Sequence, residues 1–112
     1  MALSKVWVYA ETDGDKVKTI TLEMLAKARE IGDTVEAIYG GEASGIAETL
    51  GKHGASKVYA TGDLGNKVPG AHVGAAIADL INGGNSPDLI LFGTTYDGRD
   101  VSARLSVKLD KP

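Results

Sequence analysis

The sequence predicts an α/β fold of three layers, in which a mainly parallel β-sheet lies between two layers of helices. Two observations lead to this prediction. Short apolar runs rich in β-branched and aromatic residues alternate with segments of helical periodicity, in the order βαβαβαβα. The run at residues 6–10, VWVYA, is continuous, which is typical of a strand buried on both faces. Right-handed crossovers between the strands then give a Rossmann-like fold.

The strands are expected where the apolar runs lie, at residues 6–10, 34–39, 57–61 and 88–93. A polar turn at 11–15 follows the first strand. The longest irregular stretch, residues 62–69, is a place where a functional loop would fit. Trp7 lies in the first strand, where we expect it to fill the core and its indole N–H to need an acceptor.

The helices are expected where apolar residues recur at spacings of three and four, at residues 19–31, 44–52, 73–81 and 101–109. Gly32 is a candidate C-cap for the first helix, and Ser44 is a candidate N-cap for the second. The pattern ends on a helix, where a further parallel strand would be expected to follow. We therefore expect residues 1–112 to be a single α/β domain and a piece of a longer chain.

Composition argues against several classes of protein. The net charge is −3 and the twelve Lys and Arg residues are scattered, so there is no basic cluster typical of nucleic-acid binding. The chain has no cysteine, which excludes disulfides, iron–sulfur ligation and cysteine catalysis within it. His53 and His72 have no metal-type partner at helical spacing, so we expect no metal site. No apolar run reaches the ~20 residues of a membrane span and no signal peptide is visible, which predicts a cytoplasmic protein or one of a mitochondrial matrix.

The candidate functional segment is the turn at residues 93–100, GTTYDGRD, between the last strand and the last helix. In open α/β sheets this place builds the functional crevice. The turn offers hydroxyl groups, helix-end amides and one arginine, so Thr94, Thr95, Gly98 and Arg99 are candidates for contact with an anion or a partner subunit. It contains no nucleophile, general base or metal cluster. We therefore expect binding and positioning, with no catalytic residue.

Structural roles compete with these functional ones. Thr94 and Thr95 are expected to cap the following helix, because the chain has neither of the GxGxxG and GxxxxGK[ST] motifs that would favour a phosphate contact. Arg99 opposes the helix dipole at a helix start, which indicates either a partner across an interface or a pairing with Asp97, Asp100 or solvent. The spacing of the two aspartates favours a capping arrangement, with Asp97 as the N-cap and Asp100 in the first turn.

Several segments together resemble a known family. They are KVWVYAE at 5–11, TLEML at 21–25, GKHGASKVY at 51–59, PDLILFGTT at 87–95 and GRDVSARL at 98–105. The last two are the most specific, and the resemblance covers nearly the whole chain. The sequence resembles the N-terminal domain of the electron transfer flavoprotein alpha subunit. The resemblance implies a Rossmann-like fold of the adenine-nucleotide-alpha-hydrolase-like type, and that residues 1–112 are the N-terminal domain of a longer chain. It departs from that family at Tyr96, where a small residue is usual, and at Asp97, where Asn or Ser is frequent.

The resemblance implies a function for the full-length protein. In that family the alpha subunit pairs with a beta subunit of related fold. The heterodimer accepts electrons from flavin dehydrogenases, such as the acyl-CoA dehydrogenases of fatty acid beta-oxidation, and passes them to a membrane quinone oxidoreductase. The redox FAD is held mainly by the C-terminal domain of the alpha subunit, outside the present segment, and many members hold a structural AMP in the beta subunit. The resemblance thus implies a scaffold domain without a cofactor or a catalytic site of its own, which packs on the beta subunit and supports the flavin domain.

Two other interpretations remain open at this point. A small adenine-nucleotide-binding module of the universal-stress-protein type would share the α/β pattern and the glycine-containing turn, although the phosphate signature expected of such proteins is missing. A structural module whose exposed sheet edge pairs with a second copy would explain an edge strand without cover.

Overall fold

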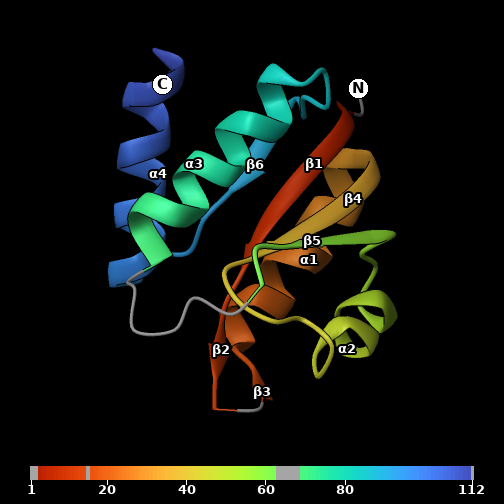
Figure 1. Cartoon of the computed structure of the whole chain (residues 1–112). Coiled ribbons are helices and arrows are strands. Elements are labelled where there is room, and N and C mark those ends of the chain that lie inside the picture. Colours follow the sequence, from red (N-terminus) through yellow and green to blue (C-terminus); the bar gives the residue numbers. More distant parts are fainter. Residues whose placement is uncertain (1–2, 15, 63–68, 112) are drawn as a thin grey trace.

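The computed structural model describes residues 3–14, 16–62 and 69–111, and it confirms the three-layer α/β architecture (Figure 1). The elements in chain order are β1 (Leu3–Ala10), β2 (Thr12–Asp13), β3 (Lys16–Val17), α1 (Thr19–Ile31), β4 (Gly32–Tyr39), α2 (Ala47–Lys52), β5 (Lys57–Ala60), α3 (Pro69–Asn82), β6 (Leu89–Leu91) and α4 (Tyr96–Leu109). Four of these strands form one parallel sheet in the order β5-β4-β1-β6. The first strand of the chain is therefore an inner strand, between β4 and β6.

The side chains of β1 alternate between the two faces of the sheet. Val6, Val8 and Ala10 belong to a core cluster with residues of α1 and α2, whereas Trp7 and Tyr9 belong to a second cluster with residues of α3 and α4. All five side chains are buried. The continuous apolar run that predicts the strand thus supplies one core on each face, because a strand covered by helices on both sides has no polar face.

Several element boundaries differ from those predicted. The expected turn at 11–15 contains β2, which pairs antiparallel with β3, and these two-residue strands are too short for periodicity to reveal. The predicted N-cap role of Ser44 is wrong: α2 begins after Ile46 without a side-chain cap, and the Ser44 backbone N–H donates to Glu42 Oε1 at 3.2 Å. α3 begins at Pro69, since proline fits the first turn of a helix. The interior of the candidate loop, residues 63–68, lies outside the described residues.

Gly32 occupies the C-cap of α1, as predicted, but the reason for glycine there is packing. Its backbone is extended, with a φ of −129°, which any residue can adopt. A Cβ atom at this position would lie 2.6 Å from Val6 Cγ2. Glycine is required because β4 starts directly against a side chain of β1.

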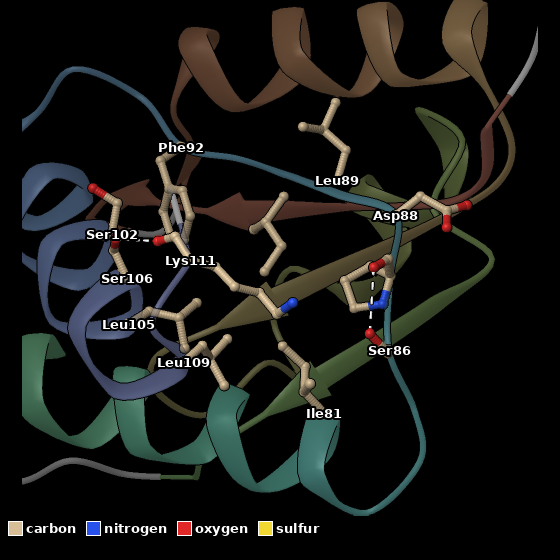
Figure 2. Close-up of a pocket in the computed structure, with 12 residues that line it drawn as sticks. Ile81, Ser86, Asp88, Leu89, Phe92, Ser102, Leu105, Ser106, Leu109 and Lys111 are labelled. Atoms are coloured by element: carbon tan, nitrogen blue, oxygen red, sulfur yellow. Dashed lines mark hydrogen bonds between the residues drawn. The ribbon is translucent and has the colours of Figure 1, made fainter.

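The two outer strands of the sheet differ in chemistry. β5 carries Lys57, whose Nζ lies 4.9 Å from the centroid of the Tyr59 ring, and a lysine on an edge strand disfavours pairing with another chain. β6 consists of Leu89, Ile90 and Leu91, and the side chain of Leu89 is 37% exposed. A groove of about 460 Å³ lies beside β6 and next to α4 (Figure 2). The sheet therefore has one edge that bears a charge and one that is wholly aliphatic.

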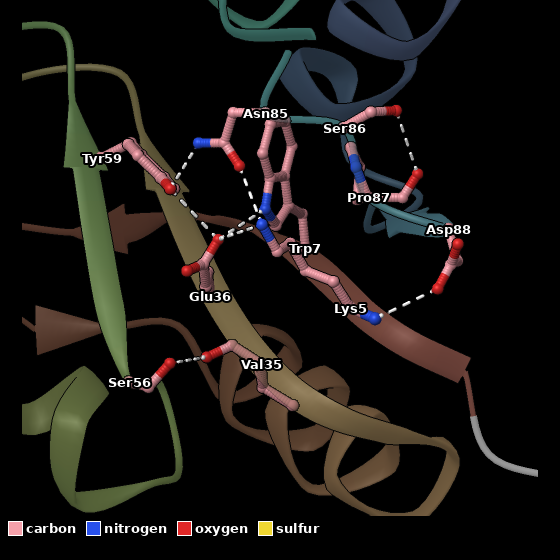
Figure 3. Close-up of polar contacts among 10 residues, drawn as sticks. All are labelled: Lys5, Trp7, Val35, Glu36, Ser56, Tyr59, Asn85, Ser86, Pro87 and Asp88. Carbon is pink, nitrogen blue, oxygen red and sulfur yellow. Dashed lines mark hydrogen bonds and ion pairs between the residues drawn. The ribbon is translucent and has the colours of Figure 1, made fainter.

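A polar network joins the strands on the α3 side of the sheet (Figure 3). Glu36, only 7% exposed, accepts hydrogen bonds from Trp7 Nε1 at 2.9 Å and from the Tyr59 hydroxyl at 3.2 Å. Asn85 donates from Nδ2 to the Tyr59 oxygen at 2.6 Å and accepts from Lys5 Nζ at 2.8 Å. Lys5 Nζ also lies 3.9 Å from Glu36 Oε1, which closes a ring of contacts. The buried carboxylate thus has the donors it needs, and the acceptor predicted for Trp7 is Glu36.

Replacing Trp7 with Phe should lower the free energy of unfolding by about 2–4 kcal/mol, because the change leaves a cavity and removes a donor from a buried carboxylate. Urea unfolding followed by circular dichroism measures this loss, since Trp7 is the only tryptophan of the chain and its fluorescence is lost with it. The same substitution in a Glu36→Leu background should cost less, by the coupling energy of the pair. Equal losses in the two backgrounds would contradict a stabilising Trp7–Glu36 bond.

Candidate functional site

The turn between β6 and α4 lies at the carboxyl edge of the sheet, next to the end of β1. β1 pairs with β4 on one side and with β6 on the other, so the strand order changes direction between β1 and β6. In parallel sheets, this is the position where a crevice forms. Glu11 directly follows β1, and Gly93, Thr94 and Thr95 follow β6. The two segments meet across this position.

Thr95 is the N-cap of α4 and also the link to β1. Its Oγ1 accepts a hydrogen bond from the backbone N–H of Gly98 at 2.9 Å. The same hydroxyl donates to the carboxylate of Glu11, whose two oxygens both lie 2.8 Å away. The predicted capping role is confirmed for Thr95. Its hydroxyl satisfies a free amide of the helix and a buried charge at once.

Glu11 is the residue of this site that the sequence does not reveal. Its side chain is 6% exposed, and Lys18 Nζ lies 4.0 Å from its Oε1. Its backbone N–H donates to Thr21 Oγ1 at 2.9 Å, and its carbonyl accepts from the backbone N–H of Lys18 at 2.9 Å. One residue therefore joins the end of β1, the start of α1 and the start of α4. The available signal is an acidic residue placed directly after an uninterrupted apolar strand, where burial forces it to find a partner.

Glycine at position 98 makes this close approach possible. A Cβ atom on Gly98 would lie 2.3 Å from the Gly93 carbonyl oxygen and 3.0 Å from Thr95 Oγ1. A Cβ atom on Gly93 would lie closest to Ile20 Cδ1, at 3.0 Å, and in ordinary contact with Glu11 Oε2 at 3.4 Å. The Gly98 amide, a candidate anion contact, is taken by Thr95, and the charge that faces the turn is a carboxylate. An anion placed there would be repelled.

The aspartates of the turn differ from their predicted arrangement. The predicted N-cap role of Asp97 is wrong, because Thr95 holds the extended backbone of a cap and Asp97 lies in the first turn of α4. Asp100 is also in the helix, and its Oδ1 accepts from Arg104 Nε at 2.9 Å. Asp100 packs closely on α3, since a Cβ on Gly70 would lie 1.9 Å from its Oδ2. The close pair Asp100–Arg104 thus lies where α3 and α4 meet.

The remaining candidates lie on the outside of the turn. Thr94 and Arg99 are exposed, and no ion pair involves Arg99 within the described part of the chain. The side chain of Tyr96 between them in sequence is 84% exposed. We refer to Thr94, Tyr96 and Arg99 as the outer turn surface. The structure therefore separates the four predicted site residues: Thr95 and Gly98 bond to each other inside, while Thr94 and Arg99 face outward.

Tyr9 lies beside this carboxylate in the core. Burial raises the pKa of its phenol above the ordinary value of 10.0, and the charge of Glu11 raises it further, with smaller contributions from Asp97, Tyr39 and Asp100. The phenol therefore stays neutral over the whole physiological range. Among the described residues, no cluster of three His, Asp or Glu side chains could hold a metal ion. None of the described helices is long and apolar enough to cross a membrane.

Comparison with known proteins identifies the family to which the chain belongs. A family model described as "Electron transfer flavoprotein domain" matches residues 6–112. The chain belongs to this family. It is 34% identical over 110 residues to the electron transfer flavoprotein subunit alpha of Syntrophomonas wolfei, a match that covers 96% of this chain and 34% of the relative. The resemblance noted from the sequence is thereby confirmed.

Two other relatives of this flavoprotein domain are also named as electron transfer proteins. The electron transfer flavoprotein subunit alpha of Clostridium acetobutylicum is 28% identical over 110 residues, covering 93% of this chain and 32% of the relative. A protein of Anaerotignum propionicum named acryloyl-CoA reductase electron transfer subunit beta is 28% identical over 109 residues, covering 93% and 30%. The chain spans about a third of the length of these relatives.

Substituting Thr95 with Ala should destabilise this electron transfer flavoprotein domain by about 2–4 kcal/mol, since the cap of α4 is lost and Glu11 loses a donor. Thr95→Ser retains both bonds and should cost less than about 1 kcal/mol. Thr94→Ala is the matched control on the outer turn surface, and its effect should stay within about 0.5 kcal/mol. Chemical denaturation gives the three values, and similar losses for Thr94→Ala and Thr95→Ala would contradict the assignment.

Stability should fall in alkali because of Tyr9. The pKa of this phenol is higher in the folded than in the unfolded state, so the folded state holds the proton more tightly. The stabilisation is fully present below pH 10.0, the ordinary value, and is lost progressively as the pH rises above it. Thermal unfolding from pH 8 to 11 should show a shallower decline for Tyr9→Phe than for the unmodified chain. The exposed Tyr96→Phe variant should follow the unmodified chain, and identical profiles for all three proteins would refute this role of Tyr9.

Proposed function

We propose that the chain is the N-terminal scaffold and dimerisation domain of an electron transfer flavoprotein alpha subunit. Two relatives described above are named alpha subunits and are about three times as long as this chain, which supports a domain of a longer subunit. Its partners are then the electron transfer flavoprotein beta subunit and the C-terminal FAD domain of its own subunit. The domain supports the flavin without a catalytic residue of its own.

The wider proposal concerns the assembled heterodimer. It accepts electrons from flavin dehydrogenases such as acyl-CoA dehydrogenases and passes them to a quinone oxidoreductase. The printed name of the Anaerotignum propionicum relative, an electron transfer subunit of a CoA-thioester reductase, supports a carrier role in chemistry of this kind. The relatives named above come from bacteria, which supports a cytoplasmic location.

The observation that carries the scaffold role is the bond between Thr95 and Glu11. This bond fixes the inner side of the turn to the end of β1, and it leaves the outer turn surface free to contact a partner. Tyrosine and arginine are enriched at the energetic centres of protein interfaces. An exposed Tyr96 and an exposed Arg99 on a turn held rigid from inside fit such a contact with the beta subunit.

The same bond argues against a nucleotide at this edge. The pyrophosphate of FAD or of an adenine nucleotide needs free helix-end amides and no facing negative charge. Here Thr95 occupies the Gly98 amide, and the buried Glu11 carboxylate faces the turn. The described residues of this edge therefore do not fit the pyrophosphate. We propose that FAD is bound outside this segment, and the nucleotide-binding alternative is disfavoured by the same geometry.

Reversing the charge of Arg99 in the full-length alpha subunit should weaken its binding to the purified beta subunit by about tenfold, equivalent to about 1.4 kcal/mol. Tyr96→Ala should have an effect of similar size. Lys27→Glu is the matched control, because it reverses an exposed lysine on α1, away from the turn. Titration calorimetry of the two subunits measures the dissociation constants.

The proposed function fails if the unmodified alpha subunit does not bind the beta subunit. If the Arg99→Glu and Lys27→Glu variants bind the beta subunit equally well, the outer turn surface is not part of the interface, although the pairing of the two subunits still stands. Denaturing the purified domain and analysing the released molecules by chromatography with mass detection tests the nucleotide alternative. We expect neither FAD nor an adenine nucleotide from residues 1–112, whereas released AMP or ATP would favour a nucleotide-binding module.

A further inference from the structure

The only tryptophan of the chain lies against a tyrosine within the polar network of Figure 3. The ring centroids of Trp7 and Tyr59 are 5.6 Å apart, and the two ring planes are tilted by 54°. Trp7 is fully buried in β1, whereas Tyr59 is half-buried on the edge strand β5. Indole and phenol rings are among the side chains that most readily lose a single electron. Because electron transfer slows steeply with distance, two such rings in contact can exchange an electron rapidly.

A carboxylate lies where the two rings meet. Glu36 Oε1 accepts hydrogen bonds from Trp7 Nε1 at 2.9 Å and from the Tyr59 hydroxyl at 3.2 Å. A phenol becomes strongly acidic once it has lost an electron, so its oxidation needs a base within hydrogen-bond reach, and Glu36 is in that position. Asn85 Nδ2 donates to the Tyr59 oxygen at 2.6 Å. This bond occupies the phenol oxygen as an acceptor and leaves its own hydrogen directed at Glu36.

A lysine beside Tyr59 favours release of the proton. Lys57 Nζ lies 4.9 Å from the centroid of the Tyr59 ring. A cation at this distance is repelled by a positive charge on the ring. A Tyr59 ring that has lost an electron is therefore more stable as a neutral phenoxyl radical, with its proton on Glu36, than as a radical cation.

Tyr9 is a second phenol in the same core cluster as Trp7, but it has no base. It lies two residues further along β1, on the same face of the sheet. The carboxylate of Glu11 accepts its hydrogen bonds from Thr95 Oγ1, and in the described part of the chain none joins it to the Tyr9 hydroxyl. Tyr9 is therefore a natural control for Tyr59, because both are tyrosines near the indole and only one is bonded to a carboxylate.

We propose that Trp7, Tyr59 and Glu36 form a redox relay, which carries an oxidising equivalent from the core to the edge of the sheet. A one-electron oxidant, such as an oxidising radical or a photoexcited flavin, takes one electron from Trp7. An electron then moves from Tyr59 to the oxidised indole, and the phenol proton moves to Glu36 Oε1. Trp7 is restored, and a neutral phenoxyl radical is left on β5. A soluble thiolate or ascorbate supplies one electron there, and Glu36 returns the proton to Tyr59.

The redox relay goes beyond the proposed scaffold role and does not depend on it. Laser flash photolysis of the 112-residue chain tests it, since Trp7 is the only tryptophan. A pulse at the long-wavelength edge of the indole absorption ionises Trp7, and a cobalt(III) ammine in oxygen-free buffer consumes the ejected electron. The absorption of the tryptophyl radical should decay as that of a tyrosyl radical rises. The rate should not depend on protein concentration, because the transfer is intramolecular.

Substitutions assign the donor and the base. Tyr59→Phe should remove the tyrosyl signal and leave a long-lived tryptophyl radical. Glu36→Gln keeps an acceptor oxygen but cannot take the proton, so the transfer should slow by about tenfold or more. Tyr9→Phe and the exposed Tyr96→Phe are the matched controls, and both should leave the decay unchanged. Circular dichroism checks that each variant is folded. A slower transfer in deuterium oxide than in water reports the same proton in the unmodified chain, without any substitution.

Four outcomes would overturn the proposal. A long-lived tryptophyl radical in the unmodified chain would mean that Trp7 loses its own proton and keeps the oxidising equivalent. Loss of the tyrosyl signal in Tyr9→Phe would assign the transfer to the other phenol. A rate that rises with protein concentration would place the electron donor on a second molecule. Equal rates in water and deuterium oxide would contradict a proton transfer to Glu36.

Discussion

The hydrogen bonds between the Thr95 hydroxyl and the Glu11 carboxylate fix the carboxyl edge of this domain. A buried carboxylate is costly unless donors surround it, and a helix start is costly unless its amides are capped. Thr95 meets both needs with one hydroxyl group, which accepts from Gly98 and donates to Glu11. Glycine at position 98 follows from this, since a Cβ there would lie 2.3 Å from the Gly93 carbonyl oxygen and 3.0 Å from Thr95 Oγ1. The division of the turn into an inner structural side and an outer exposed side has the same origin.

Much of the fold follows from the sequence because its signals are local. A strand buried on both faces leaves a continuous apolar run, and a helix on a sheet leaves apolar residues at spacings of three and four. These signals are strong in α1, whose bounds match the prediction, and in β1, which ends at Ala10 as predicted but already begins at Leu3. They are weak in the hairpin of β2 and β3, where two residues per strand form no pattern. They also mislead at α2, where Ser44 has the chemistry of a cap but lies outside the helix start.

The site was less predictable because its partners are distant. Glu11 and Thr95 are 84 residues apart, and no local pattern in either segment indicates the other. Asp97 and Thr95 are both suitable cap residues, but only the hydroxyl of Thr95 can accept from Gly98 and also donate to the Glu11 carboxylate. The same holds for Glu36, whose donors Trp7 and Tyr59 come from two different strands. The partners of the buried carboxylates in this fold are therefore set by tertiary contacts, which cannot be read from composition or from the spacing of residues in one segment.

Both ends of β1 are bonded to the last quarter of the chain. Near its start, the Ser4 backbone N–H donates to Asp88 Oδ2 at 2.7 Å, and directly after its end Glu11 meets Thr95. Contacts of this sequence separation form late, because the chain must lose much of its entropy before they are made. During synthesis on the ribosome, β1 leaves the exit tunnel first, yet it obtains these partners only once α4 has been made. The inner strand β1 is therefore synthesised early, but the hydrogen bonds that fix its two ends form only late.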